Sequence, residues 1–234
     1  MTNTHPKVFC AIDTASLESA RSMIEMVGPV TGGIKLGMEF FNTFGPDGVE
    51  DVMSACPDAK LFIDLKFHDI PTTVAATVKT VSHRLNPAYL NVHASGGPEM
   101  MRAAKAACPP STKLLSVTVL TSLSVLELGD VGIDCAPHIQ VERLARLTHD
   151  AGLDGVVCSA EEIQGLRAKF GPDFVLMVPG IRPEGADAGD QKRVMTPERA
   201  MELGATHLVI GRPITKADNP AAAAAAIMES IAAA

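Results

Sequence analysis

The charged residues of the segment DLKFHD, at positions 64–69, form the densest group in the sequence that could do chemistry. Asp64 and Lys66 are two residues apart, so on a β-strand their side chains would project to the same side. Asp69 would follow on the next loop, and Lys35 ends the preceding apolar segment. Two lysines and two carboxylates that alternate would keep each other charged and fixed in position for electrostatic catalysis. A purely structural ion-pair network is the alternative.

Two arginines late in the sequence stand in a setting that suits phosphate. Arg182 follows VPGI at 178–181, and Arg212 follows VIG at 209–211. Glycine lets the backbone approach a ligand closely, and arginine forms charge-assisted hydrogen bonds to phosphate oxygens. These segments predict that the protein binds a phosphorylated small molecule, the alternative being that both arginines are solvated at the surface.

The elements that must position these residues are eight short apolar segments that alternate with longer amphipathic or Ala-rich ones. The predicted strands are residues 7–13, 33–37, 60–66, 89–93, 114–120, 155–158, 174–178 and 207–210. The predicted helices are residues 16–27, 47–56, 72–85, 98–107, 139–151, 160–170, 197–203 and 220–231, and Ser16 is the expected N-cap of the first. Nearly continuous apolar strands indicate a parallel sheet that is buried on both faces.

Eight strand–helix units predict an α/β fold, a single (β/α)8 TIM barrel that occupies residues 1–234 as one domain. The active site of such a barrel lies at the carboxyl ends of its strands. Polar groups fall at most of those ends, namely Asp13, Lys35, Asp64 with Lys66, His93, Thr121, Ser159, Arg182 and Arg212. This one-sided distribution is typical of an enzyme.

Composition excludes several classes of protein. A net charge of −7 argues against a nucleic-acid binder. No apolar segment reaches the length of a membrane span, and the N-terminus has no apolar signal core, so we expect a cytoplasmic protein. Five cysteines without a CxxC pair indicate free thiols. The histidines lack metal-site spacing, and neither GxGxxG nor GxxxxGK[ST] occurs, so no metal or cofactor is predicted.

The segment DLKFHDIPTTV at 64–74 closely resembles the D-x-K-x-x-D-I-P-x-T signature of the orotidine 5'-phosphate decarboxylase family. The similarity continues through AID, IKLGMEFF, NVHASGG, VTVLTS, VPGIRPEG, DQKRVMTPERA and VIGRPIT, in the same order along the chain. The resemblance implies a homodimeric, cofactor-independent TIM-barrel enzyme. Such an enzyme would convert orotidine 5'-phosphate (OMP) to UMP and CO2, the last step of de novo pyrimidine biosynthesis.

The resemblance also implies roles for individual residues. Lys35, Asp64, Lys66 and Asp69 would form the catalytic charge array, with Lys66 as the proton donor to C6 of the pyrimidine. Asp69, Ile70 and Thr73 would reach the site of the neighbouring subunit. The remaining contacts would come from Asp13 to the ribose, from Thr121 to the pyrimidine, and from Arg182, Gln191, Gly211 and Arg212 to the phosphate. Ser122 and Ser124 offer hydroxyls similar to that of Thr121. The loop from about Arg182 to Gln191 would close over the substrate.

Two other functions stay open at this point. A sugar-phosphate decarboxylase or aldolase of the same superfamily would share D-x-K-x-x-D but would use Mg2+ and an enediolate intermediate. The sequence after Asp69, Ile70-Pro71-Thr72-Thr73, resembles the orotidine enzymes instead. A barrel that binds a nucleotide without catalysis is the second alternative, although such a protein would be expected to lose a member of the charge array.

Overall fold

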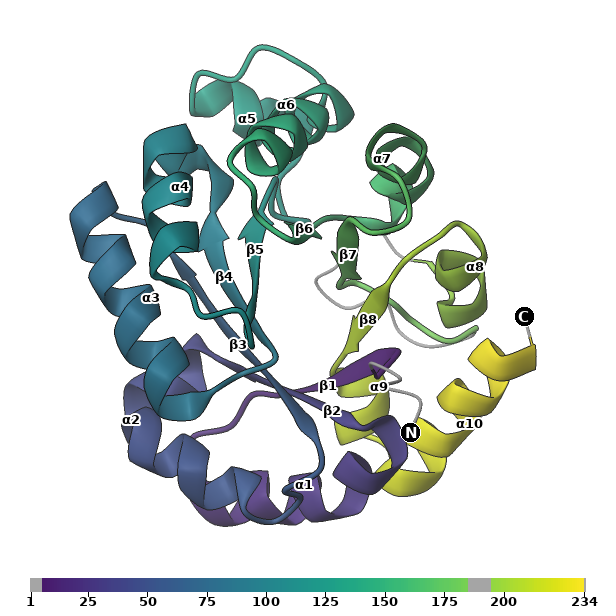
Figure 1. Cartoon of the computed structure of the whole chain (residues 1–234). Helices are drawn as coiled ribbons and strands as arrows, with labels where there is room; N and C mark the ends of the chain where they lie inside the picture. Colours follow the sequence, from purple (N-terminus) through teal and green to yellow (C-terminus); the bar gives the residue numbers. More distant parts are fainter. Residues whose placement is uncertain (1–5, 185–194, 234) are drawn as a thin grey trace.

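The computed structural model describes residues 6–184 and 195–233 and contains a closed barrel of eight parallel strands in sequence order. The strands are β1 Val8–Ile12, β2 Gly33–Gly37, β3 Lys60–Phe67, β4 Tyr89–His93, β5 Lys113–Val117, β6 Gly155–Val157, β7 Val175–Val178 and β8 His207–Ile210. Figure 1 shows the strands at the centre and the helices around them. The predicted α/β class and the single (β/α)8 barrel are confirmed.

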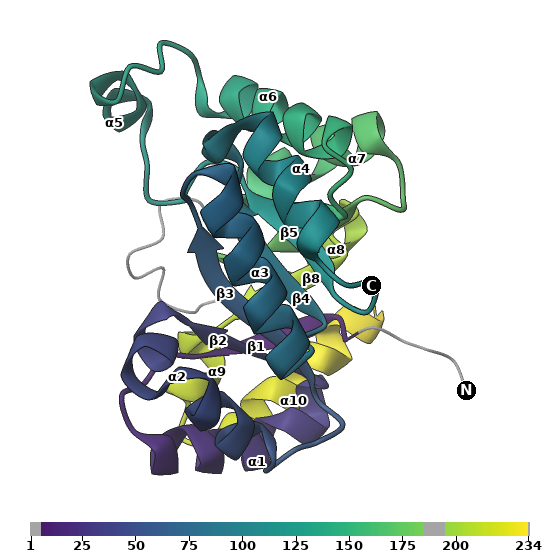
Figure 2. The same ribbon diagram turned by 60° about the vertical axis from the view of Figure 1, so that its left-hand side comes forward.

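The helices follow their strands as the barrel requires. The α-helices are α1 Leu17–Thr31, α2 Met38–Met53, α3 Pro71–Leu85, α4 Gly97–Ala107, α5 Val125–Asp130, α6 Pro137–Asp150, α7 Ile163–Phe170, α8 Pro197–Glu202, α9 Arg212–Thr215 and α10 Pro220–Ala233. Two short 3-10 turns, Ala94–Gly96 and Ala160–Glu162, precede α4 and α7. Figure 2 shows α5 standing away from the barrel at the top of the molecule.

The interior of the barrel is filled by aromatic side chains. Phe9, Phe62 and Tyr89 pack edge to face, with ring centroids 5.4–6.4 Å apart. His207 joins them, because its Nε2 lies 2.6 Å from the Tyr89 hydroxyl and its Nδ1 lies 2.7 Å from the carbonyl oxygen of Pro6. This packed plug closes the barrel below the polar ends of the strands, and His207 contributes to it through both of its ring nitrogens.

The predicted strands agree with the structure except at their ends. Residues 33–37, 89–93 and 207–210 are strands with the predicted bounds. The fifth strand ends at Val117 rather than at Leu120, because the chain turns there towards α5. The interior of β4 is not entirely apolar, since Asn91 is fully buried in it.

Three helices depart from the prediction. Helix α2 begins at Met38, well before residue 47, and Gly45 interrupts it with a φ of 64° just before Pro46. The predicted helix is therefore its second half. Helices α5 and α9 were not predicted, although Ser124 and Glu127 form a capping box at the start of α5. The Ser16 cap and the Ala-rich final helix are confirmed.

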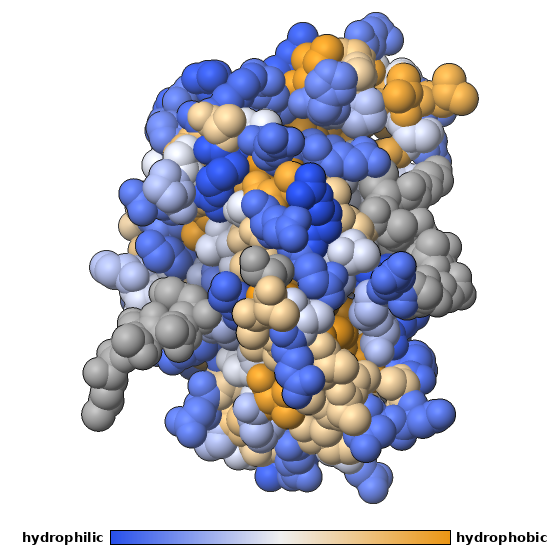
Figure 3. Space-filling view, turned by 90° about the vertical axis from the view of Figure 1, so that its right-hand side faces the viewer, coloured by the Kyte–Doolittle hydropathy of each residue, from blue (hydrophilic) through white to orange (hydrophobic). Residues whose placement is uncertain are grey.

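The face of the molecule shown in Figure 3 is mostly hydrophilic. Figure 3 shows the side of the molecule that carries α8 and α10, where a pale orange patch over α10 marks its alanines. None of the helices in residues 6–184 and 195–233 is both long and apolar enough to span a membrane. All five cysteines are free.

Candidate active site

Four charged side chains from the first three strands form one row at the carboxyl end of the barrel. Lys35 Nζ lies 3.4 Å from Asp13 Oδ1 and 3.4 Å from Asp64 Oδ2. Lys66 Nζ lies 2.7 Å from Asp64 Oδ1. The charges therefore alternate in the order Asp13, Lys35, Asp64, Lys66. We call these four residues the charge row.

Burial makes this row a strong electrostatic element. The side chains of Lys35 and Asp64 are only 10% and 14% exposed, whereas that of Lys66 is 30% exposed. Burial alone would raise the pKa of the Asp64 carboxyl, but the nearby Lys35 and Lys66 ammonium groups lower it below its ordinary value. Asp64 is thus held ionised, and one lysine of the row remains open to a ligand.

The backbone beneath the row departs from a regular strand. Lys66 has a φ of 52°, which is uncommon for a residue other than glycine. Its backbone N–H donates to Asn91 Oδ1 at 2.8 Å, and Asn91 Nδ2 donates to Asp64 Oδ1 at 2.7 Å. Sequence reasoning missed Asn91 as a site residue, although an asparagine inside the apolar strand YLNVH was a usable signal.

Asp69 does not join the charge row of its own chain, whose fourth member is Asp13, beside Lys35 at the opposite end from Lys66. Asp69 is exposed, and its carboxylate accepts the backbone N–H of Ile70 at 2.7 Å. Ile70 is 63% exposed, and Thr73 is exposed on the first turn of α3. The role of these three residues at the site of a neighbouring subunit stays a prediction.

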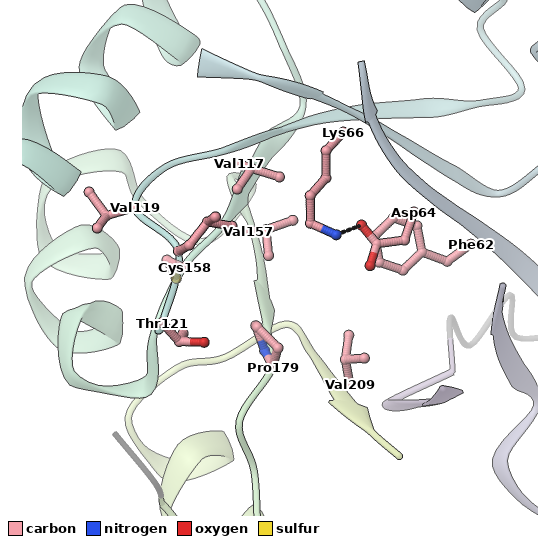
Figure 4. Close-up of a pocket in the computed structure, with 11 residues that line it drawn as sticks. Phe62, Asp64, Lys66, Val117, Val119, Thr121, Val157, Cys158, Pro179 and Val209 are labelled. Carbon is pink, nitrogen blue, oxygen red and sulfur yellow. Dashed lines mark hydrogen bonds and ion pairs between the residues drawn. The ribbon is translucent and has the colours of Figure 1, made fainter. Parts of the chain in front are cut away.

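A cavity of about 180 Å³ opens beside Asp64 and Lys66. Figure 4 shows the Lys66 amine and the Asp64 carboxylate directed at each other, with valine side chains facing them. Its apolar lining includes Phe62, Val117, Val119, Val157, Pro179 and Val209. Thr121 also lines this cavity, whereas the Ser124 hydroxyl caps α5 and Ser122 is exposed. A flat, partly apolar ring with polar edges suits such a space.

A second cavity, of about 410 Å³, lies at the end of the charge row that holds Asp13 and Lys35. It shares Pro179 and Val209 with the first cavity, so the two adjoin. Its polar lining comes from Asp13, Lys35, Arg182, Gly211, Arg212, Thr215 and Lys216. The structure therefore brings both predicted phosphate-binding arginines to one place. Gln191 and most of the predicted closing loop lie outside the described residues.

Histidines stand close to the site without forming a metal centre. His68 and His93 stack with ring centroids 5.5 Å apart, and His93 Nδ1 lies 2.7 Å from the Ser95 hydroxyl. Burial first, and then the nearby His68 and Lys66, lower the pKa of His93. Within residues 6–184 and 195–233, no group of three or more His, Cys, Asp or Glu side chains is arranged to hold a metal ion.

Comparison with known proteins gives one consistent result. Residues 6–227 match the family model described as Orotidine 5'-phosphate decarboxylase / HUMPS family. An orotidine 5'-phosphate decarboxylase of Shewanella sediminis (strain HAW-EB3) is 50% identical over 228 residues, which cover 96% of each chain. One from Erythrobacter litoralis (strain HTCC2594) is 48% identical over 217 residues, which cover 93% of this chain and 95% of that protein.

A solved structure agrees with the sequence relatives. The crystal structure of orotidine 5'-phosphate decarboxylase from Lactobacillus acidophilus matches with a TM-score of 0.83 and 35% sequence identity. The match covers 97% of this chain and 99% of that one. Both the family model and relatives of this identity extend over nearly the whole chain. The chain therefore belongs to the orotidine 5'-phosphate decarboxylase / HUMPS family.

Proposed function

We propose that this chain is a carboxy-lyase that decarboxylates OMP to UMP and CO2, the last step of de novo pyrimidine biosynthesis. The observation that carries the proposal is the charge row between two adjoining cavities. One cavity is largely apolar and holds Asp64 and Lys66, and the other holds two arginines. A pyrimidine nucleotide has the matching division into a flat ring and a phosphate. Orotidine 5'-phosphate decarboxylases are also relatives that the chain matches over nearly its full length.

The proposed chemistry needs a cation fixed beside one carbon atom. When the bond from C6 to the carboxylate breaks, the electron pair stays in an in-plane orbital on C6, which the ring π system cannot delocalise. The Lys66 ammonium, held by Asp64 at 2.7 Å, would stabilise this charge and then transfer a proton to C6. The resulting amine regains its proton from water. Asp64 would stand beside the departing carboxylate, so that repulsion between them disappears as CO2 leaves.

The second cavity would hold the ribose phosphate. Arg182 is 8% exposed and donates from Nη1 to the Ile181 carbonyl at 2.8 Å, so it is held in place by the backbone. Arg212 starts α9 directly after Gly211 and lines the same cavity. Asp13 lines this cavity beside Lys35, where a ribose hydroxyl would reach it. Phosphate binding at this distance from C6 can raise turnover by holding the ring against the charge row.

A homodimer is the second part of the proposal. Asp69, Ile70 and Thr73 are exposed directly after β3, next to Lys66. An isoleucine that is 63% exposed beside the active site is an apolar contact suited to a partner surface. In the proposed dimer, Asp69 completes the site of the other subunit. The cytoplasmic location stays a prediction from the sequence.

A sugar-phosphate enzyme of the same family is the competing function, and Asp64 weighs against it. Such an enzyme would coordinate Mg2+ through carboxylate oxygens. Here Asp64 Oδ1 accepts from Lys66 and Asn91, while Oδ2 faces Lys35. The residues Ile70-Pro71-Thr72-Thr73 after Asp69 also favour the orotidine reaction. We therefore propose that the reaction needs neither metal nor organic cofactor.

The test is two assays of the purified protein. In the first, the substrate is OMP and EDTA is in excess. In the second, the substrate is 3-keto-gulonate 6-phosphate and Mg2+ is added. Loss of orotate absorbance in EDTA, with UMP as the product, is the expected result. Turnover of the sugar phosphate but not of OMP would show that the chain is a metal-dependent sugar-phosphate enzyme. Binding of UMP by a protein that turns over neither substrate would favour a non-catalytic nucleotide-binding barrel.

A further inference from the structure

Strands β3 and β4 lose their regular pairing beside the charge row. Ile63 pairs with Leu90, and the next pair is Phe67 with Val92. Three residues of β3 therefore lie opposite a single residue of β4, which makes a bulge. The bulge contains both Asp64 and Lys66, so the geometry of the charge row depends on how the bulge is held.

Asn91 is the single residue opposite the bulge, and its side chain replaces the missing backbone partner. Its Oδ1 accepts the backbone N–H of Lys66 at 2.8 Å, and its Nδ2 donates to Asp64 Oδ1 at 2.7 Å. The residue is 0% exposed, so water does not compete for either hydrogen bond. Lys66 adopts a φ of 52° at this point, a conformation that a non-glycine residue keeps only when its surroundings hold it there.

We propose that Asn91 is a positioning residue: its amide holds the β3 bulge in the conformation that directs Asp64 and Lys66 at the same cavity. Asn91 does not line either cavity, so it acts through those two residues. The effect on catalysis rests on the proposed function, whereas the effect on Asp64 does not.

The chemistry of the amide explains why asparagine stands there. The position needs one acceptor for a backbone N–H and one donor for a carboxylate oxygen, both on a short side chain. Leucine has a similar size but offers neither group. Aspartate at neutral pH would accept from Lys66 but would place a second negative charge against Asp64.

The first experiment compares wild type with Asn91→Leu. The hydrogen bond to the Asp64 carboxylate is charge-assisted, so we expect kcat for OMP to fall about 10- to 100-fold. The Kd for UMP should stay within about threefold, since ribose-phosphate contacts at Arg212 are untouched. Ser116→Ala is the matched control, because it removes a buried hydrogen bond between β5 and Thr148 of α6. It should lower the Tm and leave kcat unchanged.

The second variant, Asn91→Asp, tests the pH dependence of kcat, which a purely structural role of Asn91 would not change. Its carboxyl group, once protonated, again offers one donor and one acceptor. The ratio of variant to wild-type kcat should therefore rise as the pH is lowered from about 8 to about 5. The charged and titratable groups around it are Lys35 on β2, Asp64 and Lys66 on β3, His68 after β3, and His93 on β4. All five are present in both proteins, so the ratio isolates the new carboxyl group.

The third readout needs no substrate. Carbon-13 NMR of the Asp64 carboxyl should show a higher pKa in Asn91→Leu than in wild type, because one donor to the carboxylate is lost. The proposal is overturned if that pKa and kcat both stay at wild-type values. It is also overturned if kcat and UMP binding fall together with the folded fraction. A wild type that does not decarboxylate OMP refutes the proposed function, while the NMR shift still decides the role of Asn91.

Discussion

The ammonium nitrogen of Lys66 lies 2.7 Å from Oδ1 of Asp64, the shortest contact in a row of four alternating charges. Buried charges are costly unless each has an opposite neighbour. Here the two inner members, Lys35 and Asp64, have opposite charges on both sides. Lys66 ends the row, lines the first cavity and is 30% exposed, so its ammonium group can reach a ligand in that cavity.

Acid should weaken the fold through Asp64. Burial acts to raise the pKa of its carboxyl, but Lys35 and Lys66 hold it below the ordinary value. A carboxyl whose pKa is lower in the folded than in the unfolded state stabilises the fold above the ordinary aspartate range. That contribution disappears as the pH falls through the lowered pKa. The free energy of unfolding should therefore fall more steeply with acid for wild type than for Asp64→Asn. Urea unfolding between about pH 7 and about pH 3 measures this, and parallel curves would refute it.

Removal of a phosphate-binding arginine should weaken substrate binding. Arg212→Ala is expected to raise KM for OMP about 10- to 100-fold, the effect of one lost charge-assisted contact. The same variant should not alter kcat/KM for orotidine, which lacks the phosphate. Arg199→Ala, which removes a surface ion pair with Glu202, is the control. Equal losses with both substrates would place Arg212 outside the phosphate site.

Subunit mixing tests whether Asp69 acts across a dimer interface. Lys66→Ala and Asp69→Ala should each be inactive alone. Unfolded together and refolded as a mixture, they should regain about a quarter of wild-type activity, because half of the dimers are mixed and each mixed dimer has one complete site. A mixture no more active than its components would show that Asp69 serves its own chain or no site.

Ile70→Glu should shift the protein towards monomers in sedimentation.

The buried pair of Tyr89 and His207 should affect stability and not catalysis. Tyr89→Phe keeps the ring in the barrel plug but leaves His207 Nε2 without the hydroxyl that lies 2.6 Å away. We expect a loss of about 0.5–1.5 kcal/mol in the free energy of unfolding, the net contribution of one buried hydrogen bond. Denaturant unfolding measures this loss. A fall in kcat with unchanged stability would contradict the structural role.

Particular residues show how far the sequence leads. The continuous apolar strands were enough to predict the barrel. The spacing of two residues in D-x-K was enough to predict the contact between Asp64 and Lys66. The reason for that contact was only partly right, because the strand bulges at Lys66 and is not regular there. A bulge depends on which side chain of the next strand replaces a lost backbone partner. The asparagine in YLNVH marks a polar side chain inside an apolar strand, but the local sequence does not show which groups of β3 it bonds.

The position of Asp69 shows a second limit. Its spacing predicted a place in the charge array, but within one chain its carboxylate accepts the backbone N–H of Ile70, and the fourth charge of the row is Asp13 of β1. Spacing along one strand says nothing of a carboxylate that arrives from elsewhere in the barrel. Helix α5 differs, because its capping box at Ser124 and Glu127 is a helix-start signal that the sequence itself carries.

The most direct test of the whole account is the rate of OMP decarboxylation in excess EDTA by wild type and by Lys66→Ala. Lys169→Ala, which removes an ammonium group paired with Glu142 on the surface, is the matched control. We predict rapid conversion to UMP by wild type and by the control, and a loss of at least about 1,000-fold in kcat for Lys66→Ala, since both charge stabilisation and proton donation are lost. Conversion by Lys66→Ala at the wild-type rate, or none by well-folded wild type, would contradict the account.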